Sequence, residues 1–169
     1  QKAAGQVQAG LLLDIGCGNC HYMCRFTSVT RYVGVDLPLR NPTQPRPAAW
    51  ASGLRLPFAS ETFDTVLCTQ VIEHIPEPRL LVQEAFRVLR EGGTLILTAP
   101  QTWGLHEEPR DYYRFTQYGI RYLLESGGFR VEWIKARGGV FRMIGQTLLS
   151  FLYVRNKVRQ LTPWHKRIN

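Results

Sequence analysis

Short apolar runs recur along the chain, and each ends at a glycine, a proline or an acidic residue. This pattern is typical of strands that are buried on both faces of a parallel sheet. The runs predict strands over residues 10–15, 31–36, 63–69 and 94–99. A further alternating stretch, residues 129–136, predicts one more strand.

Between these runs, apolar residues recur at helical spacing. The spacing predicts helices over residues 20–27, 78–90, 117–126 and 140–161. The glycine pairs 92–93 and 127–128 are expected to cap the second and third of these helices. The segment 38–48 carries four prolines and is expected to be a loop. Strands separated by helices predict an α/β fold, a Rossmann-like, doubly wound, mostly parallel sheet with helices on both faces.

The charge of the chain divides it into two regions. Residues 1–134 hold 13 basic and 13 acidic side chains, whereas residues 135–169 hold eight basic and no acidic ones, so the tail carries the whole net charge of +8. We therefore expect a main domain over residues 1–136 and a basic amphipathic helical tail over 137–169. The tail helix could lie in an anionic membrane interface, bind a partner, cover its own sheet, or only aid solubility.

Localisation is inferred from what the sequence lacks. No run approaches the roughly 18 apolar residues that cross a bilayer, and the first ten residues lack the pattern of a secretory signal. The expectation is a cytoplasmic protein, with peripheral membrane contact through the tail as an extension of it.

Three cysteines, Cys17, Cys20 and Cys24, form a Cys-x2-Cys-x3-Cys cluster, and Cys68 stands apart. Metal ligation would need a fourth ligand, for which His21 or Cys68 could be proposed. In a reducing compartment such cysteines are better explained as small apolar fillers, so no metal site is expected.

The first predicted strand ends in a glycine-rich turn, Asp14-Ile15-Gly16-Cys17-Gly18. Two glycines one residue apart let the backbone pass close to a ligand. A dinucleotide-binding loop would place a third glycine where this chain has His21, which disfavours a nicotinamide cofactor. Asp36 closes the second strand and could accept hydrogen bonds from both hydroxyls of a ribose, or merely cap the turn at Pro38.

Several motifs in register then resemble one family. The segments LLLDIGCGNC, VGVDL, LRLPFASETFDTVLCTQVIEHI and EAFRVLREGGTLILTAP are similar to class I methyltransferases of the type 11 group, which includes ubiquinone and menaquinone methyltransferases. The resemblance covers about residues 11–100. It implies S-adenosylmethionine as cofactor, with S-adenosylhomocysteine as product.

The resemblance also implies roles for individual residues. Asp14, Gly16, Cys17 and Gly18 would frame the methionine portion, Asp36 would hold the ribose, and Leu37 would pack on adenine. Adenine would also meet Ser52, Gly53 and Leu54, and the methionine end would meet Thr69, Gln70 and Val71. Two positions depart from the family pattern, since relatives often have Gly at Cys20 and Asp at Ser52.

Residues 101–116, called the acceptor segment below, follow the fourth strand and are rich in aromatic and ionisable side chains. In an open α/β sheet such a segment overhangs the ligand crevice. The residues predicted to contact the acceptor are Trp103, His106, Tyr112, Tyr113 and Arg114. His106 and Asp111 are the candidates for a general base, although Asp111, Arg114 and the tyrosines could equally form a salt bridge and packing cluster.

The Glu73-His74 pair matches the EH pair of the family. His74 has a pKa range suited to a base, but a structural role in capping or orienting the following helix is favoured over catalysis.

The expected function is methyl transfer to an unidentified acceptor, a small molecule or a lipid-linked or glycan-linked metabolite. The alternatives are a nucleic-acid methyltransferase that uses the basic tail, and a non-catalytic cofactor-binding module. The family fold begins with a helix and finishes with an antiparallel hairpin, neither of which is clearly encoded here. We therefore expect either a shortened chain or a sheet completed by another chain, as in a homodimer.

Overall fold

A computed structural model describes residues 3–4, 10–26, 29–38 and 47–161. Its elements in chain order are β1 (Ala3–Ala4), β2 (Leu11–Ile15), the 3-10 turn η1 (Met23–Arg25), β3 (Arg31–Asp36), β4 (Ala49–Trp50), β5 (Phe63–Thr69), the 3-10 turn η2 (Ile72–His74), α1 (Pro78–Val88), β6 (Leu89–Thr98), α2 (Gln117–Ser126), β7 (Arg130–Val131) and α3 (Val140–Leu161). Most of the proline-rich segment predicted as a loop lies outside the described residues.

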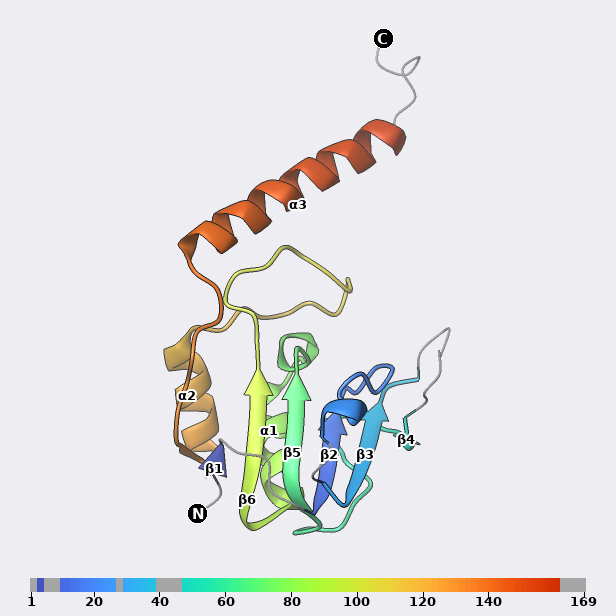
Figure 1. Ribbon diagram of the computed structural model, residues 1–169, viewed down its shortest axis with the longest axis vertical. Helices are drawn as coiled ribbons and strands as arrows, with labels where there is room; N and C mark the ends of the chain where they lie inside the picture. Colours follow the sequence, from blue (N-terminus) through green and yellow to red (C-terminus); the bar gives the residue numbers. More distant parts are fainter. Residues whose placement is uncertain (1–2, 5–9, 27–28, 39–46, 162–169) are drawn as a thin grey trace.

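The strands form one sheet in the order β4-β3-β2-β5-β6-β1-β7, and neighbouring strands pair in parallel. From the central pair β2 and β5, the chain steps to β3 in one direction and to β6 in the other (Figure 1). Because parallel crossovers are right-handed, these two connections lie on opposite faces of the sheet. The predicted doubly wound parallel sheet is confirmed.

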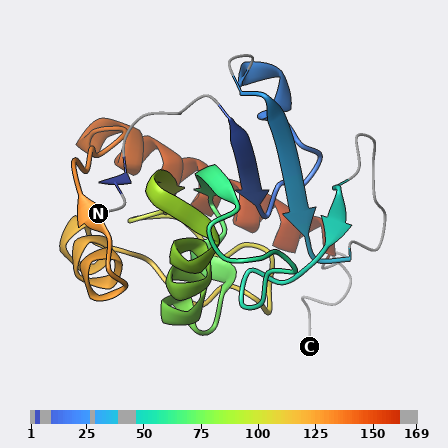
Figure 2. The ribbon, with the colours of Figure 1, turned by 90° about the horizontal axis from the view of Figure 1, so that it is seen from below.

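The helices α1 and α2 lie on the same side of the sheet (Figure 2). The buried residues of α1, Leu81, Val82, Ala85 and Val88, form one stripe at helical spacing. Phe86 of α1 meets Phe129, which follows α2, with ring centroids 5.2 Å apart and nearly perpendicular planes. The central strands contribute wholly buried residues such as Leu13 and Val66 to the same core.

The prediction of a helix after β2 is wrong. Within residues 20–26, only Met23–Arg25 are helical, and as a single 3-10 turn. Cys20 has φ +52°, a left-handed conformation that a right-handed helix cannot include. Thr27 of the predicted helix lies outside the described part of the chain.

Two further boundaries differ from the prediction. The glycine cap predicted for α1 at residues 92–93 is wrong. The helix ends at Val88, the extended residue Leu89 follows, and β6 begins there. Gly92 does adopt a left-handed φ of +74°, but it serves an irregularity in the β5–β6 pairing, where the register jumps from Phe63↔Leu89 to Thr65↔Thr94. The strand predicted over 129–136 is only β7, two residues that pair with the unpredicted β1.

The predicted bounds of β3, β5, α2 and α3 agree with the structure. The helix α3 lies beyond the carboxyl ends of the strands, on the far side of the acceptor segment (Figure 1). In the described part of the chain, no helix combines the length and the apolarity that crossing a bilayer requires.

Candidate functional site

The carboxyl ends of β2, β3 and β5 meet at one edge of the sheet, because β2 pairs in parallel with both neighbours. Ile15 at the end of β2 lies in register with Val35 of β3 and with Cys68 of β5. The turns that follow these three strands therefore lie side by side. We call this region the cofactor edge: residues 14–18, 36–37, 52–54 and 69–71.

The glycine turn of the cofactor edge is fixed by backbone hydrogen bonds. The amides of Gly16 and Cys17 donate to the Val35 carbonyl, at 2.8 and 3.1 Å. Gly16 has φ +69°, and a Cβ there would lie 2.3 Å from Cγ2 of Val71. Gly18 has φ +53°, but a Cβ there would meet open space. Packing thus requires glycine at residue 16, whereas Gly18 lies beside open space.

Asp36 joins the two motifs that the sequence analysis singled out. Its Oδ2 accepts the Gly18 amide at 2.7 Å, and its Oδ1 accepts the amide of Leu37 at 2.7 Å. An ionised carboxylate has about four lone-pair sites, so each oxygen can accept one more hydrogen bond. The glycine turn and Asp36 therefore converge, as predicted. Leu37 is partly exposed beside them.

Asp14 is wholly buried at the end of β2. Its Oδ2 accepts a hydrogen bond from the hydroxyl of Tyr32 on β3, while its Oδ1 has no hydrogen-bond partner. Burial raises the pKa of the Asp14 carboxyl to about 7, although the Tyr32 hydrogen bond acts to lower it. Sequence reasoning did not identify Tyr32, because the contact depends on the register of β2 against β3.

The cysteines of the turn face inward. Cys17 and Cys20 are buried, with their sulfurs 3.7 Å apart, and both reach the space beside Gly34 of β3. Burial raises the pKa of the Cys17 thiol. Cys24 is exposed, and among the described residues the cysteines belong to no cluster with metal-ligand spacing. The interpretation of Cys17 and Cys20 as small apolar fillers agrees with this packing. The left-handed backbone of Cys20 explains a preference for glycine there.

The turn after β4 is tied to the same edge. The Ala51 amide donates to the Asp36 carbonyl at 2.8 Å, and the Leu54 amide donates to Oγ of Ser52 at 3.2 Å. A Cβ on Gly53 would lie 2.7 Å from Cδ1 of Leu81, so this turn packs directly on α1. Ser52 and the backbone of Gly53 and Leu54 are thereby placed beside Asp36.

After β5, the chain turns sharply at Gln70, which has φ +55°. Its amide donates to the Thr98 carbonyl and its side-chain Nε2 to Thr98 Oγ1, both at 3.1 Å. The side chain of Gln70 is therefore drawn toward β6, while Val71 packs against Gly16. Thr69 ends β5 between these contacts.

The acceptor segment is held by an internal clamp. The Arg114 guanidinium binds both oxygens of Asp111, at 2.7 and 2.8 Å, and also donates to the carbonyls of Trp103 and Gly104. Asp111 Oδ2 also accepts the His106 amide at 2.9 Å. The Arg114 charge and hydrogen bonds hold the pKa of Asp111 well below its usual range. These contacts favour the salt-bridge role of Asp111 over the role of a base.

The acceptor segment is also anchored to η2. The amides of Tyr112 and Tyr113 donate to the Glu73 carbonyl, at 2.9 and 3.2 Å, and the His74 Nδ1 contacts the Arg110 carbonyl at 2.5 Å. His74 was expected to cap or orient the helix that follows; the capping part is wrong, because its ring binds the acceptor segment. The side chains of Trp103, Tyr112 and Tyr113 are exposed.

Glu73 is the ionisable residue whose environment the sequence analysis did not foresee. Its side chain is wholly inaccessible, and neither carboxylate oxygen has a hydrogen-bond partner. Burial raises its pKa. The only signal in the sequence was its place in the EH pair, which says nothing about burial.

Comparisons with known proteins agree with this geometry. A family model described as a methyltransferase domain matches residues 13–97, 85 of the 169 residues. An uncharacterized methyltransferase of Mycolicibacterium vanbaalenii is 37% identical over 108 residues, 58% of this chain and 42% of the relative. One of Mycobacterium leprae is 35% identical over 97 residues, 52% of this chain and 36% of that protein. The chain spans about two fifths of the length of these curated relatives.

Solved structures share the fold. A phosphoethanolamine N-methyltransferase of Haemonchus contortus, solved with phosphomonomethylethanolamine and S-adenosylhomocysteine, gives a TM-score of 0.61 at 20% identity, covering 93% of this chain and 42% of that one. An S-adenosylmethionine-dependent methyltransferase of Methanosarcina mazei gives a TM-score of 0.60 at 19% identity, covering 78% of this chain and 85% of that one. With the family model matching half of its sequence, and with the glycine turn and Asp36 in contact, the chain belongs to the methyltransferase domain family.

Proposed function

We propose that this chain binds S-adenosylmethionine at the cofactor edge and directs its methyl group to a small-molecule, lipid-linked or glycan-linked acceptor. One observation supports the cofactor most strongly: the Gly18 amide and the Asp36 carboxylate meet at 2.7 Å beside open space at Gly18. When bound, S-adenosylmethionine supplies a methyl group on a sulfonium, which is transferred by in-line displacement.

The residues present fit this cofactor. The unpartnered Oδ1 of buried Asp14 suits a cationic group, since an unpaired buried carboxylate oxygen is costly. The methionine ammonium would satisfy it. Asp36 retains the acceptor capacity that two ribose hydroxyls require. Leu37, Ser52 and the backbone of Gly53 and Leu54 would border the adenine.

The chain's own contribution to methyl transfer is alignment and exclusion of water. The acceptor segment is suited to this, because the clamp of Asp111 and Arg114 holds its backbone while aromatic side chains remain exposed. Trp103, Tyr112 and Tyr113 would then form an apolar wall against the acceptor.

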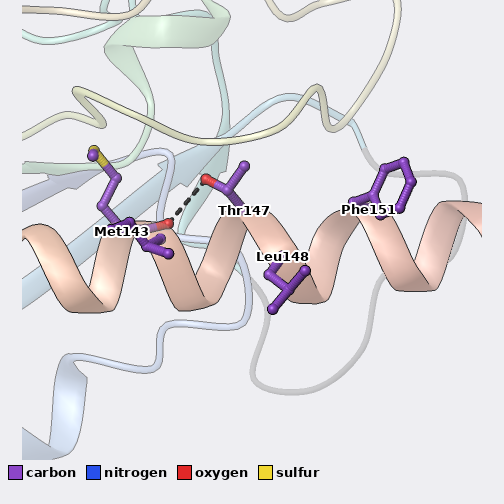
Figure 3. A pocket seen from close by; sticks show the side chains of 5 residues that line it. Met143, Thr147, Leu148 and Phe151 are labelled. Atoms are coloured by element: carbon purple, nitrogen blue, oxygen red, sulfur yellow. Dashed lines mark hydrogen bonds between the residues drawn. The ribbon is translucent and has the colours of Figure 1, made fainter.

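We place the acceptor at a membrane surface because of α3. Eight apolar side chains of this helix are exposed: Val140, Phe141, Met143, Ile144, Leu148, Leu149, Phe151 and Leu152. A shallow groove on the helix is lined by Met143, Ile144, Thr147, Leu148 and Phe151; Figure 3 draws these five side chains and labels four of them. The tail from residue 135 carries eight basic and no acidic residues. Exposed apolar groups combined with positive charge match an anionic bilayer interface.

Vesicle co-sedimentation tests the membrane part. The protein should bind vesicles of phosphatidylcholine and phosphatidylglycerol, bind pure phosphatidylcholine more weakly, and dissociate as salt is raised. The double variant Leu148→Ser and Phe151→Ser should lose binding, whereas Tyr118→Ser, which removes an exposed aromatic residue from α2, should not. Salt-sensitive binding to RNA without binding to vesicles would instead favour the nucleic-acid alternative.

A further inference from the structure

Three potential metal ligands gather where η2 meets the acceptor segment. One ligand atom each from Glu73, His74 and His106 can be chosen so that all lie within 4.8 Å of one another. The two imidazole rings are in edge-to-face contact, with centroids 4.7 Å apart, and His74 Nε2 lies 3.9 Å from Oε1 of Glu73. Residues from two distant parts of the sequence thus form one cluster.

The buried carboxylate of Glu73 points to a missing partner. Its side chain is wholly inaccessible and neither oxygen has a hydrogen bond, so within the described structure its one recorded ionic contact is with His74 Nε2, at 3.9 Å. Its backbone is fixed, because the Glu73 carbonyl accepts the amides of Tyr112 and Tyr113. Buried charges in proteins are normally paired or coordinate a metal.

Both histidines are already oriented through one ring nitrogen. His74 Nδ1 lies 2.5 Å from the Arg110 carbonyl, which holds a proton on Nδ1 and leaves the lone pair on Nε2. His106 Nδ1 lies 3.2 Å from the Gly104 carbonyl and 3.4 Å from Oδ2 of Asp111. A carbonyl or carboxylate behind each imidazole is the usual outer support of a metal-binding histidine.

We propose that Glu73, His74 and His106 bind a divalent transition cation, with Zn²⁺ as the best match. Two histidines and a glutamate are a known zinc ligand set that leaves a fourth position open. Ligand atoms around tetrahedral zinc lie roughly 3.3–3.5 Å apart, as follows from bonds of about 2.0–2.1 Å. The 3.9 Å separation of Glu73 Oε1 and His74 Nε2 is close to this value, and no pair of ligand atoms, all within 4.8 Å, has to close by more than about 1.5 Å.

The site has a consequence for the acceptor, which rests on the proposed function. An acceptor oxygen in the open fourth position would be polarised by the cation and would lose its proton more readily. His106 would then be a metal ligand and could not act as a general base, because its free lone pair would be used in coordination. Glu107 lies beside the cluster, with its Oε2 3.9 Å from His74 Nε2.

Metal titration of the full chain tests the site without any methyl transfer. Chelator-treated protein is titrated with ZnCl₂ in a calorimeter and with Co²⁺ in a spectrophotometer. We expect one equivalent to bind, with Co²⁺ giving the visible absorption of a tetrahedral site and no thiolate charge-transfer band. Glu73→Gln and His106→Ala should each weaken binding by more than the roughly 10–100-fold that loss of an outer partner costs. His21→Ala, which removes an exposed histidine outside the cluster, should bind as the parent does.

Thermal unfolding of each variant shows whether it is folded, and Asp111→Asn adds a milder test, with an expected loss of roughly tenfold. Failure of the folded parent to bind Zn²⁺ overturns the proposal. So does binding that survives in both Glu73→Gln and His106→Ala, or a thiolate band that disappears on Cys20→Ser or Cys24→Ser. Since S-adenosylhomocysteine binding is measured separately, failure here leaves the cofactor proposal standing.

Discussion

The cofactor edge and the acceptor segment lie near one another but are held by different interactions. At the cofactor edge, backbone amides of a glycine turn bind the neighbouring strand, and Asp36 binds the Gly18 amide directly. In the acceptor segment, the side chains of Arg114, Asp111 and His74 add to the backbone bonds that the segment makes with Glu73. The cofactor edge is therefore specified by short motifs at the ends of strands. The residues of the acceptor segment that face solvent can be substituted without altering the sheet, because the clamp lies within the segment.

The largest effect on stability is expected at Gly16, where the left-handed backbone and the packing against Val71 both require glycine. Gly16→Val would force a left-handed β-branched residue and a clash with Val71. We expect a loss of about 2–4 kcal/mol in the free energy of unfolding, measured by urea denaturation, together with loss of cofactor binding. Gly18→Ala is the matched control, because its Cβ meets open space. It should cost only about 1–2 kcal/mol, and equal losses in the two variants would contradict the packing account.

The next effect is a dependence of folding stability on pH, which arises from Asp14. Its folded pKa of about 7 exceeds the value of roughly 3.9 expected when unfolded. The folded state therefore binds more protons between these two values. Without cofactor, stability should fall as pH rises from about 4 to about 7, by at most about 1.4 kcal/mol per unit.

Cofactor affinity should show the opposite trend, because an ammonium favours ionised Asp14. Below about pH 7, the affinity for S-adenosylhomocysteine should weaken by up to roughly tenfold per pH unit. In Asp14→Asn, both the stability slope and the affinity slope should disappear. A calorimetric pH series that gives parallel slopes for parent and variant would remove Asp14 from the cofactor site.

The residues of the cofactor edge also show what could be predicted from the sequence. Gly16, Gly18 and Asp36 were predicted because parallel strands bring their carboxyl ends to one edge, and local turn chemistry marks those ends; the role of Asp14 came from the family resemblance. The partner of Asp14, Tyr32, could not be predicted, because a shift of one residue in the β2–β3 register would turn its side chain to the other face.

In the acceptor segment, the salt bridge between Asp111 and Arg114 was one of two predicted alternatives and is confirmed, whereas the attachment of the segment to η2 was not predicted. His74 and Arg110 are 36 residues apart, and their contact depends on how the segment folds back over η2. The burial of Glu73 has the same origin, since the chain that covers it comes later in the sequence. The helix wrongly predicted after β2 cannot include its first residue, Cys20, which is left-handed, and only the 3-10 turn Met23–Arg25 follows; apolar spacing reveals neither feature.

A smaller effect is expected in the acceptor segment. Arg114→Lys keeps the charge but loses the bidentate geometry with Asp111. Amides near the clamp should exchange hydrogen roughly tenfold faster, whereas S-adenosylhomocysteine affinity should stay unchanged. Arg121→Lys, at an exposed position of α2, is the control for exchanging arginine for lysine. Weaker binding of S-adenosylhomocysteine by Arg114→Lys, with unchanged hydrogen exchange, would show that the two regions are not separate.

The smallest effect is expected from Tyr113→Phe. This change removes one hydroxyl, which donates to the Pro76 carbonyl at 2.9 Å from a partly exposed ring. We expect a loss of about 0.5–1.5 kcal/mol in the free energy of unfolding at most, measured by thermal or urea unfolding. A larger loss would mean that the tyrosine anchors the whole segment.

Calorimetric titration of S-adenosylhomocysteine into the folded chain tests the central claim most directly. We predict one binding site per chain, weakened at least about tenfold in Asp36→Ala, which loses charge-assisted hydrogen bonds to ligand and turn. Glu125→Gln, an exposed change on α2, should bind as the parent does. Absence of binding by the folded parent, or equal affinity in Asp36→Ala, would contradict a nucleoside site at the junction of Gly18 and Asp36.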